Sequence, residues 1–209
     1  MNKVERKRVN SENTARPDAC LLVTCHPSPT SFCARIATVV KDAIEARGGR
    51  ILIDDLIGVG FNPTITRQEF EVFYRDRVPE DLADLVAHLR AARELVFVLP
   101  VWMYGLPAIL KGYFDRVWRP HVAYRIDGDE IEALLGHITR MTVIVTHGRS
   151  KAETALVGDG TDLFFDRSLS SLLPNATDRR RFDFYALDTP DASEMERELQ
   201  RVRDRFRSA

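Results

Sequence analysis

The sequence predicts an α/β protein with three layers, in which a doubly wound parallel sheet has helices on both faces. Short apolar runs typical of buried strands recur along the chain, and segments with helical spacing of apolar residues follow them. Five such strand–helix units fit the 209 residues of the chain. Parallel strands need crossover connections of this kind, and a chain of this size can bury a core on both sides of one sheet.

The first two strands are expected at residues 19–25 and 50–54, where apolar runs are bounded by polar or turn-forming residues. Between them, apolar residues recur at helical spacing from Phe32 through Ile36, Val40 and Ile44. The pair Gly48-Gly49 is expected to end this first helix.

The middle of the chain is expected to contain two further helices and one strand. Residues 79–93 place Leu82, Leu85 and Leu89 on one helical face, with Pro79 in the first turn. The apolar run at 95–99 is the third strand. A helix follows at 107–118 and again has a proline at its start.

The last third of the chain continues the alternation. Strands are expected at 141–146 and 182–187, with a helix between them at 163–173 and a final helix whose apolar stripe ends at Phe206. Two segments do not fit the alternation. Residues 61–78 are expected to contain a short helix near 67–74, and residues 119–137 are expected to be irregular, with a turn at 127–129.

Charge and cysteine content exclude several classes of protein. Lys and Arg number 30 against 31 Asp and Glu, so no overall positive field exists to bind nucleic acid. The three cysteines, Cys20, Cys25 and Cys33, have no CxxC spacing, which argues against a disulfide scaffold and a structural zinc site. No metal is therefore expected, and a reducing, cytoplasmic setting is the default.

The N-terminal residues 1–18 are expected to form a flexible tail ahead of one domain at 19–209. The tail is polar and basic and lacks the apolar stretch of a secretory signal. The longest apolar run, at 95–110, is short for a membrane span and is broken by Pro100, Gly105 and Pro107. No integral membrane segment is expected.

In an open parallel sheet, ligands bind beyond the carboxyl ends of the strands, so three loops are candidates for a site. The loop after the first strand, at 26–32, carries His26, Thr30 and Ser31 just before a helix N-terminus, where an anion can bind. The loop has no glycine and therefore matches neither GxGxxG nor a Walker motif. Thr30 or Ser31 could equally serve only to cap the helix, so both interpretations are open.

The loop after the third strand is the most informative of the three. It carries Trp102 and Tyr104 at the expected cleft, within a backbone shaped by two prolines and Gly105. Backbone N–H groups here could meet the polar edge of a flat ring while side chains cover its face. The alternative is that both aromatic residues only cap the core. Lys111 and Asp115, four apart on the next helix, are expected to form a surface ion pair.

The loop after the fourth strand contains Thr146, His147, Gly148 and Arg149. Gly148 allows close approach of a backbone, and His147 is a titratable group near the proposed ring site. A simple turn with one polar histidine, and a solvated Arg149, would also explain this segment.

The segment 100–117, PVWMYGLPAILKGYFDRV, resembles the flavodoxin-like NAD(P)H:quinone oxidoreductases. This family includes bacterial NAD(P)H dehydrogenases and the ancillary flavoproteins of potassium efflux systems. Residues 26–32 (HPSPTSF) and 122–124 (VAY) also match, so the resemblance extends over about residues 20–187. It implies a flavodoxin-like domain with five parallel strands in the order 2-1-3-4-5.

The resemblance also implies a bound flavin, FAD or FMN, with NADH or NADPH as electron donor. The phosphate side of the flavin would contact His26, Thr30, Ser31, Phe32 and Cys33. The flavin ring would lie against Pro100, Val101, Trp102, Met103 and Tyr104, with Thr146, His147, Gly148 and Arg149 on its other side. Nicotinamide and quinone would use one pocket lined by Trp102, Tyr124 and Ile126, at the interface of a homodimer.

The implied reaction is a ping-pong transfer of a hydride from NAD(P)H through the flavin to a quinone-like acceptor. His147 or Tyr124 would protonate the acceptor. The sequence departs from the family pattern at Cys33, where many members have Asn, at Gly148, where two glycines often stand, and at Ile126, where some relatives have an aromatic residue. Residues 151–165 contain no recognisable counterpart of the Tyr and His that some members use in hydride transfer.

Two non-enzymatic functions remain open alongside this one. The fold could hold a flavin as a one-electron carrier, or the protein could be an ancillary, regulatory subunit of a membrane transporter. A carrier usually has a strongly acidic docking surface, and the net charge of −1 argues against it.

Overall fold

The computed structural model describes residues 18–187 and 191–207. Its main sheet is formed by β1 (Ala19–Thr24), β2 (Ile51–Asp55), β3 (Ala92–Pro100), β6 (Arg140–Thr146) and β7 (Asp178–Phe184). The strands lie in the order β2-β1-β3-β6-β7, and each neighbouring pair is parallel. Counted in chain order within this sheet, the five strands have the predicted order 2-1-3-4-5.

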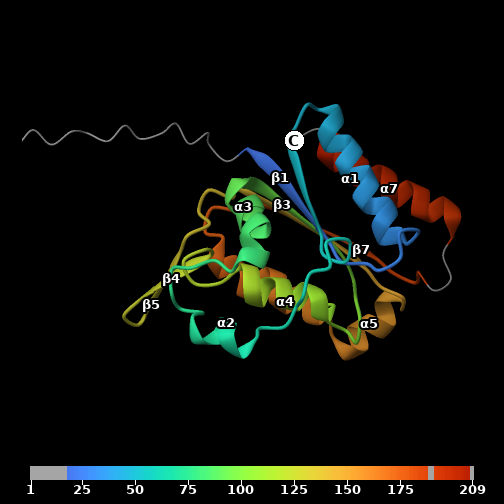
Figure 1. Ribbon diagram of the computed structural model, residues 1–209. Helices are drawn as coiled ribbons and strands as arrows, with labels where there is room; N and C mark the ends of the chain where they lie inside the picture. The colour runs from blue at the N-terminus through green and yellow to red at the C-terminus, as the bar shows by residue number, and fades with distance from the viewer. Residues whose placement is uncertain (1–17, 188–190, 208–209) are drawn as a thin grey trace, which may run out of the picture.

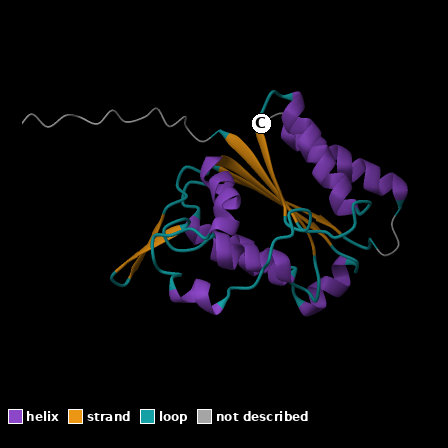
Figure 2. Ribbon diagram, in the orientation of Figure 1, coloured by secondary structure: helices purple, strands orange, loops and turns teal. Residues whose placement is uncertain are grey.

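Helices cover both faces of the sheet (Figures 1 and 2). One face is covered by α1 (Phe32–Ala46) and α7 (Ala192–Arg207), which pack against each other. The other face carries α3 (Ala83–Ala91) and α4 (Ala108–Val117), whereas α5 (Lys151–Val157) lies near the carboxyl end of the sheet. The short helix α2 (Arg67–Glu71) and a 3-10 turn, η1 (Glu80–Leu82), precede α3.

Alternate residues of each central strand face the two helical layers. Leu21 and Phe97 pack in the cluster that includes residues of α3 and α4, whereas Leu22 and Val96 pack in the cluster that includes residues of α1 and α7. Successive side chains of a strand point to opposite faces, so a strand buried on both faces is a continuous apolar run. This is why the apolar runs at 19–25 and 95–99 predict these two strands, although β3 begins three residues before its predicted start.

The first helix begins at the predicted residue. Ser31 is its N-cap, and the Ser31 Oγ accepts a hydrogen bond from Ala34 N at 3.1 Å. The helix ends at Ala46, shortly before Gly48, whose φ of +73° is a conformation that glycine adopts readily. The capping interpretation of the first loop is therefore confirmed for Ser31 and leaves the anion interpretation open.

Two predictions for the last third of the chain are wrong in their bounds. β7 begins at Asp178, four residues before the predicted start, and ends at Phe184. β7 is an edge strand with one neighbouring strand, and edge strands tolerate charged residues. A search for apolar runs therefore misses its charged first half. The helix predicted for 163–173 is a succession of α6 (Gly160–Leu163), the π-helix η2 (Phe164–Ser168) and the 3-10 helix η3 (Leu169–Leu172).

Residues 119–137, predicted to be irregular, contain a hairpin formed by β4 (Tyr124–Asp127) and β5 (Glu130–Ala133). Asp127 pairs with Glu130, which leaves Gly128 and Asp129 as a two-residue turn, and Gly128 has a φ of +60°. The turn is predicted at the right place, but its strands are short and exposed and have no apolar run. The hairpin projects at the end of the molecule remote from α5 (Figure 1).

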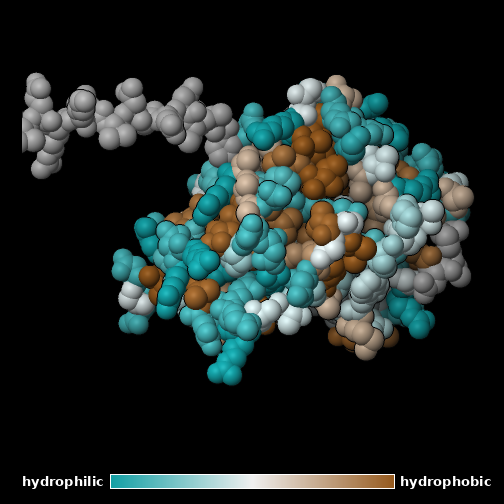
Figure 3. Space-filling view, in the orientation of Figure 1, coloured by the Kyte–Doolittle hydropathy of each residue, from teal (hydrophilic) through white to brown (hydrophobic). Residues whose placement is uncertain are grey.

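The surface seen in Figure 3 is largely hydrophilic, and hydrophobic residues gather over the front edge of the sheet, where β2 is the edge strand.

The predicted ion pair between Lys111 and Asp115 is confirmed. Among the described residues, no helix combines the length and the apolar character needed to cross a membrane. Apart from Asp18, the predicted tail lies outside the described residues, and one domain over 19–209 stays a prediction.

Candidate functional site

The loops after β1, β3 and β6 meet at the carboxyl end of the sheet. Val101 N donates to Thr146 O at 2.8 Å, which joins the second loop to the third. Cys33 Sγ lies 3.2 Å from Thr146 Oγ1, which joins the start of α1 to the third loop. Between them lies a cavity of about 330 Å³, called the central groove below. It is lined by residues of all three loops and one residue after β7: His26, Phe32, Cys33, Pro100, Val101, Trp102, Thr146, His147, Gly148 and Leu187.

A second cavity of about 260 Å³ shares three lining residues with the central groove: Val101, His147 and Gly148. It adds Met103, Tyr104, Arg149 and Thr154 to the lining. Trp102 and His147, from different loops, therefore line one cavity. Of the residues predicted in these loops, Thr30 and Ser31 line neither cavity.

The first loop presents hydrogen-bond donors at the start of α1. Ser28 N donates to His26 Nδ1 at 3.0 Å, so that nitrogen carries no proton and the neutral ring has its N–H at Nε2. His26 lines the central groove and can therefore donate from Nε2. The backbone N–H groups of Phe32 and Cys33, in the first turn of a 15-residue helix, have no intrahelical acceptor. Such a set of donors is suited to a phosphate.

The second loop contains a two-residue turn with unusual backbone angles. Trp102 and Gly105 exchange backbone hydrogen bonds of 3.2 and 3.1 Å, and Met103 and Tyr104 between them have φ values of +49° and +58°. A side-chain-bearing residue pays roughly 1–2 kcal/mol for a left-handed conformation. Strain of this kind is typical of functional loops. The predicted turn residue Gly105 has no positive φ.

This turn leaves Trp102 beside the central groove with 45% of its surface exposed. The interpretation in which Trp102 only caps the core is therefore wrong. Gly160 N donates to Tyr104 O at 2.9 Å, and a Cβ at Gly160 would lie 2.8 Å from that oxygen. The start of α6 thus supports the turn from outside the groove.

The third loop buries His147 almost completely, with 2% of its surface exposed. Its Nε2 lies 3.1 Å from Asp183 Oδ1 and 3.8 Å from Asp159 Oδ2. The ring of Tyr185 stacks on the imidazole, with centroids 4.3 Å apart and 18° between the planes. His147 is therefore a buried and paired side chain, and both a structural role and a role at the groove stay open.

Arg181 holds the carboxylates around His147. Its guanidinium donates to Asp183 through Nε at 2.9 Å and through Nη2 at 2.8 Å, and to Asp159 through Nη2 at 2.8 Å. Burial alone would raise the pKa of Asp183, but the hydrogen bonds from His147 and Arg181 lower it below its usual value. The ligand atoms of His147, Asp159 and Asp183 lie within 4.8 Å of one another, a spacing that could hold a metal ion. The guanidinium already pairs with both carboxylates.

The remaining polar groups of the loops have simpler roles. Arg149 is exposed and forms an ion pair with Glu153 at 3.6 Å, as a solvated arginine would. Ser150 and Glu153 form the capping box that starts α5, a helix that the sequence analysis missed although its S-x-x-E signature is visible. Burial raises the pKa of the Cys33 thiol to about 11, and burial raises that of Cys25 further, so neither is a thiolate nucleophile at neutral pH.

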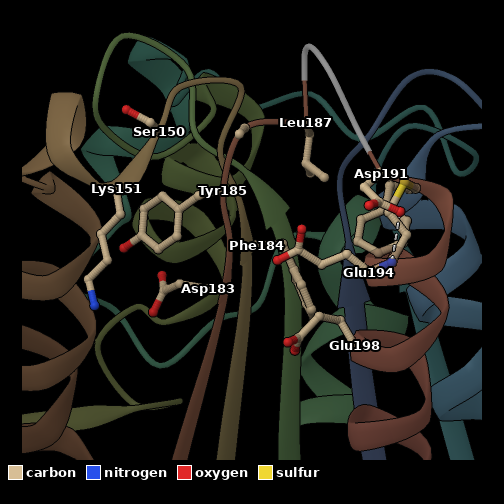
Figure 4. Close-up of a pocket in the computed structure, with 12 residues that line it drawn as sticks. Ser150, Lys151, Asp183, Phe184, Tyr185, Leu187, Asp191, Glu194 and Glu198 are labelled. Carbon is tan, nitrogen blue, oxygen red and sulfur yellow. Dashed lines mark hydrogen bonds between the residues drawn. The ribbon is translucent and has the colours of Figure 1, made fainter.

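A further cavity of about 290 Å³ adjoins the central groove and shares Phe32 and Leu187 with it. Figure 4 shows Asp183 and Tyr185 on one side of it, while Glu194 and Glu198 extend from α7 on the other. Because its rim is acidic, this cavity is a poor place for a phosphate.

Tyr124 and Ile126 do not join the three loops. Tyr124 lines a separate pocket with Phe114 and Trp118, and Ile126 lies exposed on the hairpin. Burial raises the pKa of Tyr124 above its usual value. Within one chain, therefore, the predicted substrate residues of the hairpin do not line the same groove as Trp102.

The sequence analysis missed the side chains that surround His147 from β7. Arg181, Asp183 and Tyr185 occupy alternate positions and so share one face of the strand and its continuation. Their alternation along the chain could have indicated a shared face. It was missed because the strand was predicted from an apolar run that starts at residue 182, after Arg181. Asp159 lies just before α6, where no pattern marks it.

Comparison with known proteins supports the fold. A family model described as a flavodoxin-like fold matches residues 19–206. An uncharacterised NAD(P)H oxidoreductase of Haemophilus influenzae is 30% identical over 156 residues, which cover 74% of each chain.

Two solved structures have the same fold. The NAD(P)H:quinone oxidoreductase of Methanothermobacter marburgensis superposes with a TM-score of 0.78 at 22% identity, over 91% of this chain and 98% of the other. An FMN-dependent NADH-azoreductase of Bacillus anthracis, solved in complex with FMN, has a TM-score of 0.67 at 16% identity, over 90% and 97% of the two chains.

Proposed function

This chain belongs to the family of proteins with a flavodoxin-like fold, and from that premise we propose that it is a flavin-dependent NAD(P)H dehydrogenase that reduces a quinone or a similar acceptor. The observation that carries the proposal is the convergence of three loops on one groove. Hydrogen-bond donors suited to a phosphate lie at one end of this groove, and the aromatic side chain of Trp102 lines it. Relatives named as NAD(P)H oxidoreductases and quinone reductases support the electron donor and the acceptor class.

The residues present fit a flavin. His26 Nε2 and the first amides of α1 would hold its phosphate, because all are donors at the positive end of a helix. Trp102 would cover the ring, and Pro100 and Val101 would form the wall beside it. When bound, the flavin would supply hydride transfer between the nicotinamide and the acceptor.

The protein would contribute orientation, exclusion of water and hydrogen-bond donors. The strained Met103–Tyr104 turn, supported by Gly160, would hold Trp102 and the backbone N–H groups of the second loop in place. Donors from the second and third loops would stabilise negative charge on the reduced ring. Because Cys25 and Cys33 are held as thiols, no covalent attachment through them is part of the proposal.

Purified protein tests this proposal directly. We expect a yellow protein whose visible spectrum bleaches on anaerobic addition of NADH or NADPH and recovers on addition of a quinone. Release of the pigment by heat and its chromatography will distinguish FMN from FAD. A colourless protein that neither FMN nor FAD reconstitutes would contradict the proposed function.

Replacing Trp102 by alanine is expected to weaken flavin binding by roughly tenfold to a hundredfold, because one face of the ring loses its aromatic cover. The measurement is fluorescence titration of the apoprotein with flavin. Phe70→Ala is the matched control, since Phe70 is also an exposed aromatic residue but lines neither cavity. Equal affinities for the wild type and the Trp102 variant would remove Trp102 from the site.

We also propose that the protein is a homodimer in which the hairpin completes the site of the other copy. Ile126 and Ile131 are directly opposed on the hairpin and both are exposed, so they form an apolar patch on one of its faces. The family resemblance implies that Tyr124 and Ile126 line the substrate pocket, yet within one chain Tyr124 lines a separate pocket.

Light scattering after size-exclusion chromatography tests the dimer. We expect twice the 23.8 kDa of one chain for the wild type and one chain's mass for Ile126→Glu, together with slower quinone reduction. Arg125→Ala, on the other face of the hairpin, should remain dimeric. A wild-type protein of one chain's mass that reduces quinone at full rate would sink this part of the proposal.

A further inference from the structure

On the basis of the proposed function, we propose that Arg181 is a positioning residue that ties together the two loops expected on either side of the flavin ring. Arg181 lies on β7 and lines neither cavity of the groove. Its guanidinium is joined to the second loop through the start of α6 and to the third loop through Asp183. A single rigid group therefore links the two loops from outside the groove.

The start of α6 connects Arg181 to the second loop. Arg181 Nη2 donates to Asp159 Oδ2 and to Thr161 Oγ1, each at 2.8 Å. Asp159 Oδ1 caps α6 by accepting from Thr161 N at 2.9 Å. Gly160, which stands between these two residues, donates from its backbone N to Tyr104 O at 2.9 Å. The guanidinium therefore fixes the residues on both sides of the one that contacts the second loop.

The second loop needs such a support because its turn is strained. Met103 and Tyr104 have φ values of +49° and +58°, a left-handed conformation that is costly for residues with side chains. Residues in such conformations persist only when the surrounding structure over-determines them. The contact with Gly160 is close, because a Cβ there would lie 2.8 Å from Tyr104 O. This contact therefore opposes relaxation of the turn that presents Trp102 to the groove.

The third loop is attached to the same guanidinium through β7. Arg181 donates to Asp183 through Nε at 2.9 Å and through Nη2 at 2.8 Å, and Asp183 Oδ1 lies 3.1 Å from His147 Nε2. The backbone of His147 is also held by β7 and its continuation. His147 N donates to Phe184 O at 2.7 Å, and Leu187 N donates to His147 O at 3.1 Å. Displacement of Arg181 would therefore disturb the third loop as well as the second.

An arginine is well suited to this link. Its guanidinium is planar and presents donors in fixed directions, so it sets the distance between Asp159 and Asp183. Burial alone would lower the pKa of Arg181, but the hydrogen bond with Asp183 and the charges of the nearby carboxylates raise it, so the group stays charged. The oxygen atoms of Asp159 and Asp183 lie within 4.8 Å of each other. Without the guanidinium these two carboxylates would repel each other, and the start of α6 would separate from β7.

Hydrogen exchange of the protein without flavin tests the link. Arg181→Lys keeps the positive charge, but a single ammonium cannot reproduce the fork that reaches Asp159 and Asp183 together. We expect the backbone amides of the second loop (101–106) and the third loop (146–150) to exchange roughly tenfold faster in this variant, as measured by mass spectrometry of peptides. The amides of β1 and β3 should exchange at their wild-type rates.

Two further variants separate the two loops from each other. Gly160→Ala should speed exchange in the second loop only, because the new methyl group would press on Tyr104 O while Arg181 still holds Asp183. Asp162→Asn is the matched control. The Asp162 carboxylate also pairs with Arg181, at 2.9 Å, but its side chain is 57% exposed and lies outside the contacts that lead to the two loops. Both loops should therefore exchange at wild-type rates in the Asp162 variant.

Fluorescence titration of the apoprotein with FMN and with riboflavin tests the consequence for the flavin. Riboflavin has the ring but no phosphate, and the link lies on the ring side of the groove. Arg181→Lys and Gly160→Ala should therefore weaken the binding of both flavins by a similar factor, roughly tenfold, whereas Asp162→Asn should bind both as the wild type does. A loss confined to FMN would place the effect at the phosphate end and overturn the proposal.

The outcomes separate this inference from the proposed function. Wild-type exchange in both loops of Arg181→Lys would overturn the inference. Equally faster exchange throughout the chain would overturn it too, since a general loss of stability has that result. If Arg181→Lys does not fold, Asp159→Asn should still speed exchange of the second loop, because it loses the charge paired with Arg181 and keeps an oxygen that can cap α6. A protein that binds neither FMN nor riboflavin would refute the proposed function, while the exchange rates would still test the link.

Discussion

Replacing Glu69 by alanine is expected to lower the free energy of unfolding by about 3–5 kcal/mol, because it leaves buried charges without their partner. The Glu69 carboxylate accepts from Arg116 Nε at 2.9 Å and from Arg119 Nη1 at 3.3 Å. The side chain of Arg119 is wholly buried, and burial lowers its pKa. Without Glu69, Arg119 loses this ion pair, and Arg116 retains, within the described ranges, the one with the more exposed Asp81.

Urea denaturation followed by circular dichroism measures this loss. Glu71→Ala is the matched control on the same helix. Glu71 is exposed and, among the described residues, its ion pair is with Arg67 at 3.5 Å, so its removal should change the stability by less than about 0.5 kcal/mol. A loss below 1 kcal/mol for the Glu69 variant would show that water reaches the two arginines and that they need no buried counter-charge.

Replacing Gly112 by alanine is expected to cost about 3 kcal/mol or to prevent folding, because the backbone of another segment occupies the place of the new methyl group. A Cβ at Gly112 would lie 2.3 Å from Pro63 Cβ and 2.4 Å from Pro63 O. Alanine in the middle of a helix ordinarily stabilises it by roughly 1 kcal/mol relative to glycine. A lower free energy of unfolding in the Gly112 variant would therefore indicate the close contact between α4 and Pro63, and a higher one would indicate that the contact is loose.

Gly136→Ala is the control for this change. Its Cβ would meet only the end of the Asn175 side chain, at 3.3 Å, which can move aside. We expect a small effect there and a large one at Gly112 in the same denaturation experiment. An alanine at position 112 that raises the stability would mean that the segment around Pro63 is free to withdraw from α4.

The accuracy of the sequence predictions follows the burial of each element. β1 and β3 are buried on both faces, so their apolar runs predict them, and the Ser31 cap and Gly48 mark the ends of α1. β7 is an edge strand and carries charged residues, so its predicted start lies four residues after the observed one. The β4–β5 hairpin is exposed and also carries charged residues, so its strands were not predicted. The α6–η3 segment has apolar residues at helical spacing, but its backbone changes from α to π to 3-10 geometry.

The candidate site shows the same division. The three loops could be predicted because parallel strands end at one edge of the sheet, which places Trp102 and His147 together from their positions in the chain alone. The contacts of His147 with Asp183 and Asp159 could not be predicted, because they depend on how β7 and the start of α6 pack around the third loop.

The sequence by itself determined the layered fold and the loops that form the groove, because apolar periodicity and turn residues act locally along the chain. The order of the strands was implied by the resemblance to a known family. The tertiary structure alone decided the positive φ values at Met103 and Tyr104, the partners of His147 and the separation of Tyr124 from the groove. The partners of His147 and the separation of Tyr124 arise from contacts between residues far apart in the chain, and the Met103–Tyr104 turn adopts a conformation that its residue types do not favour.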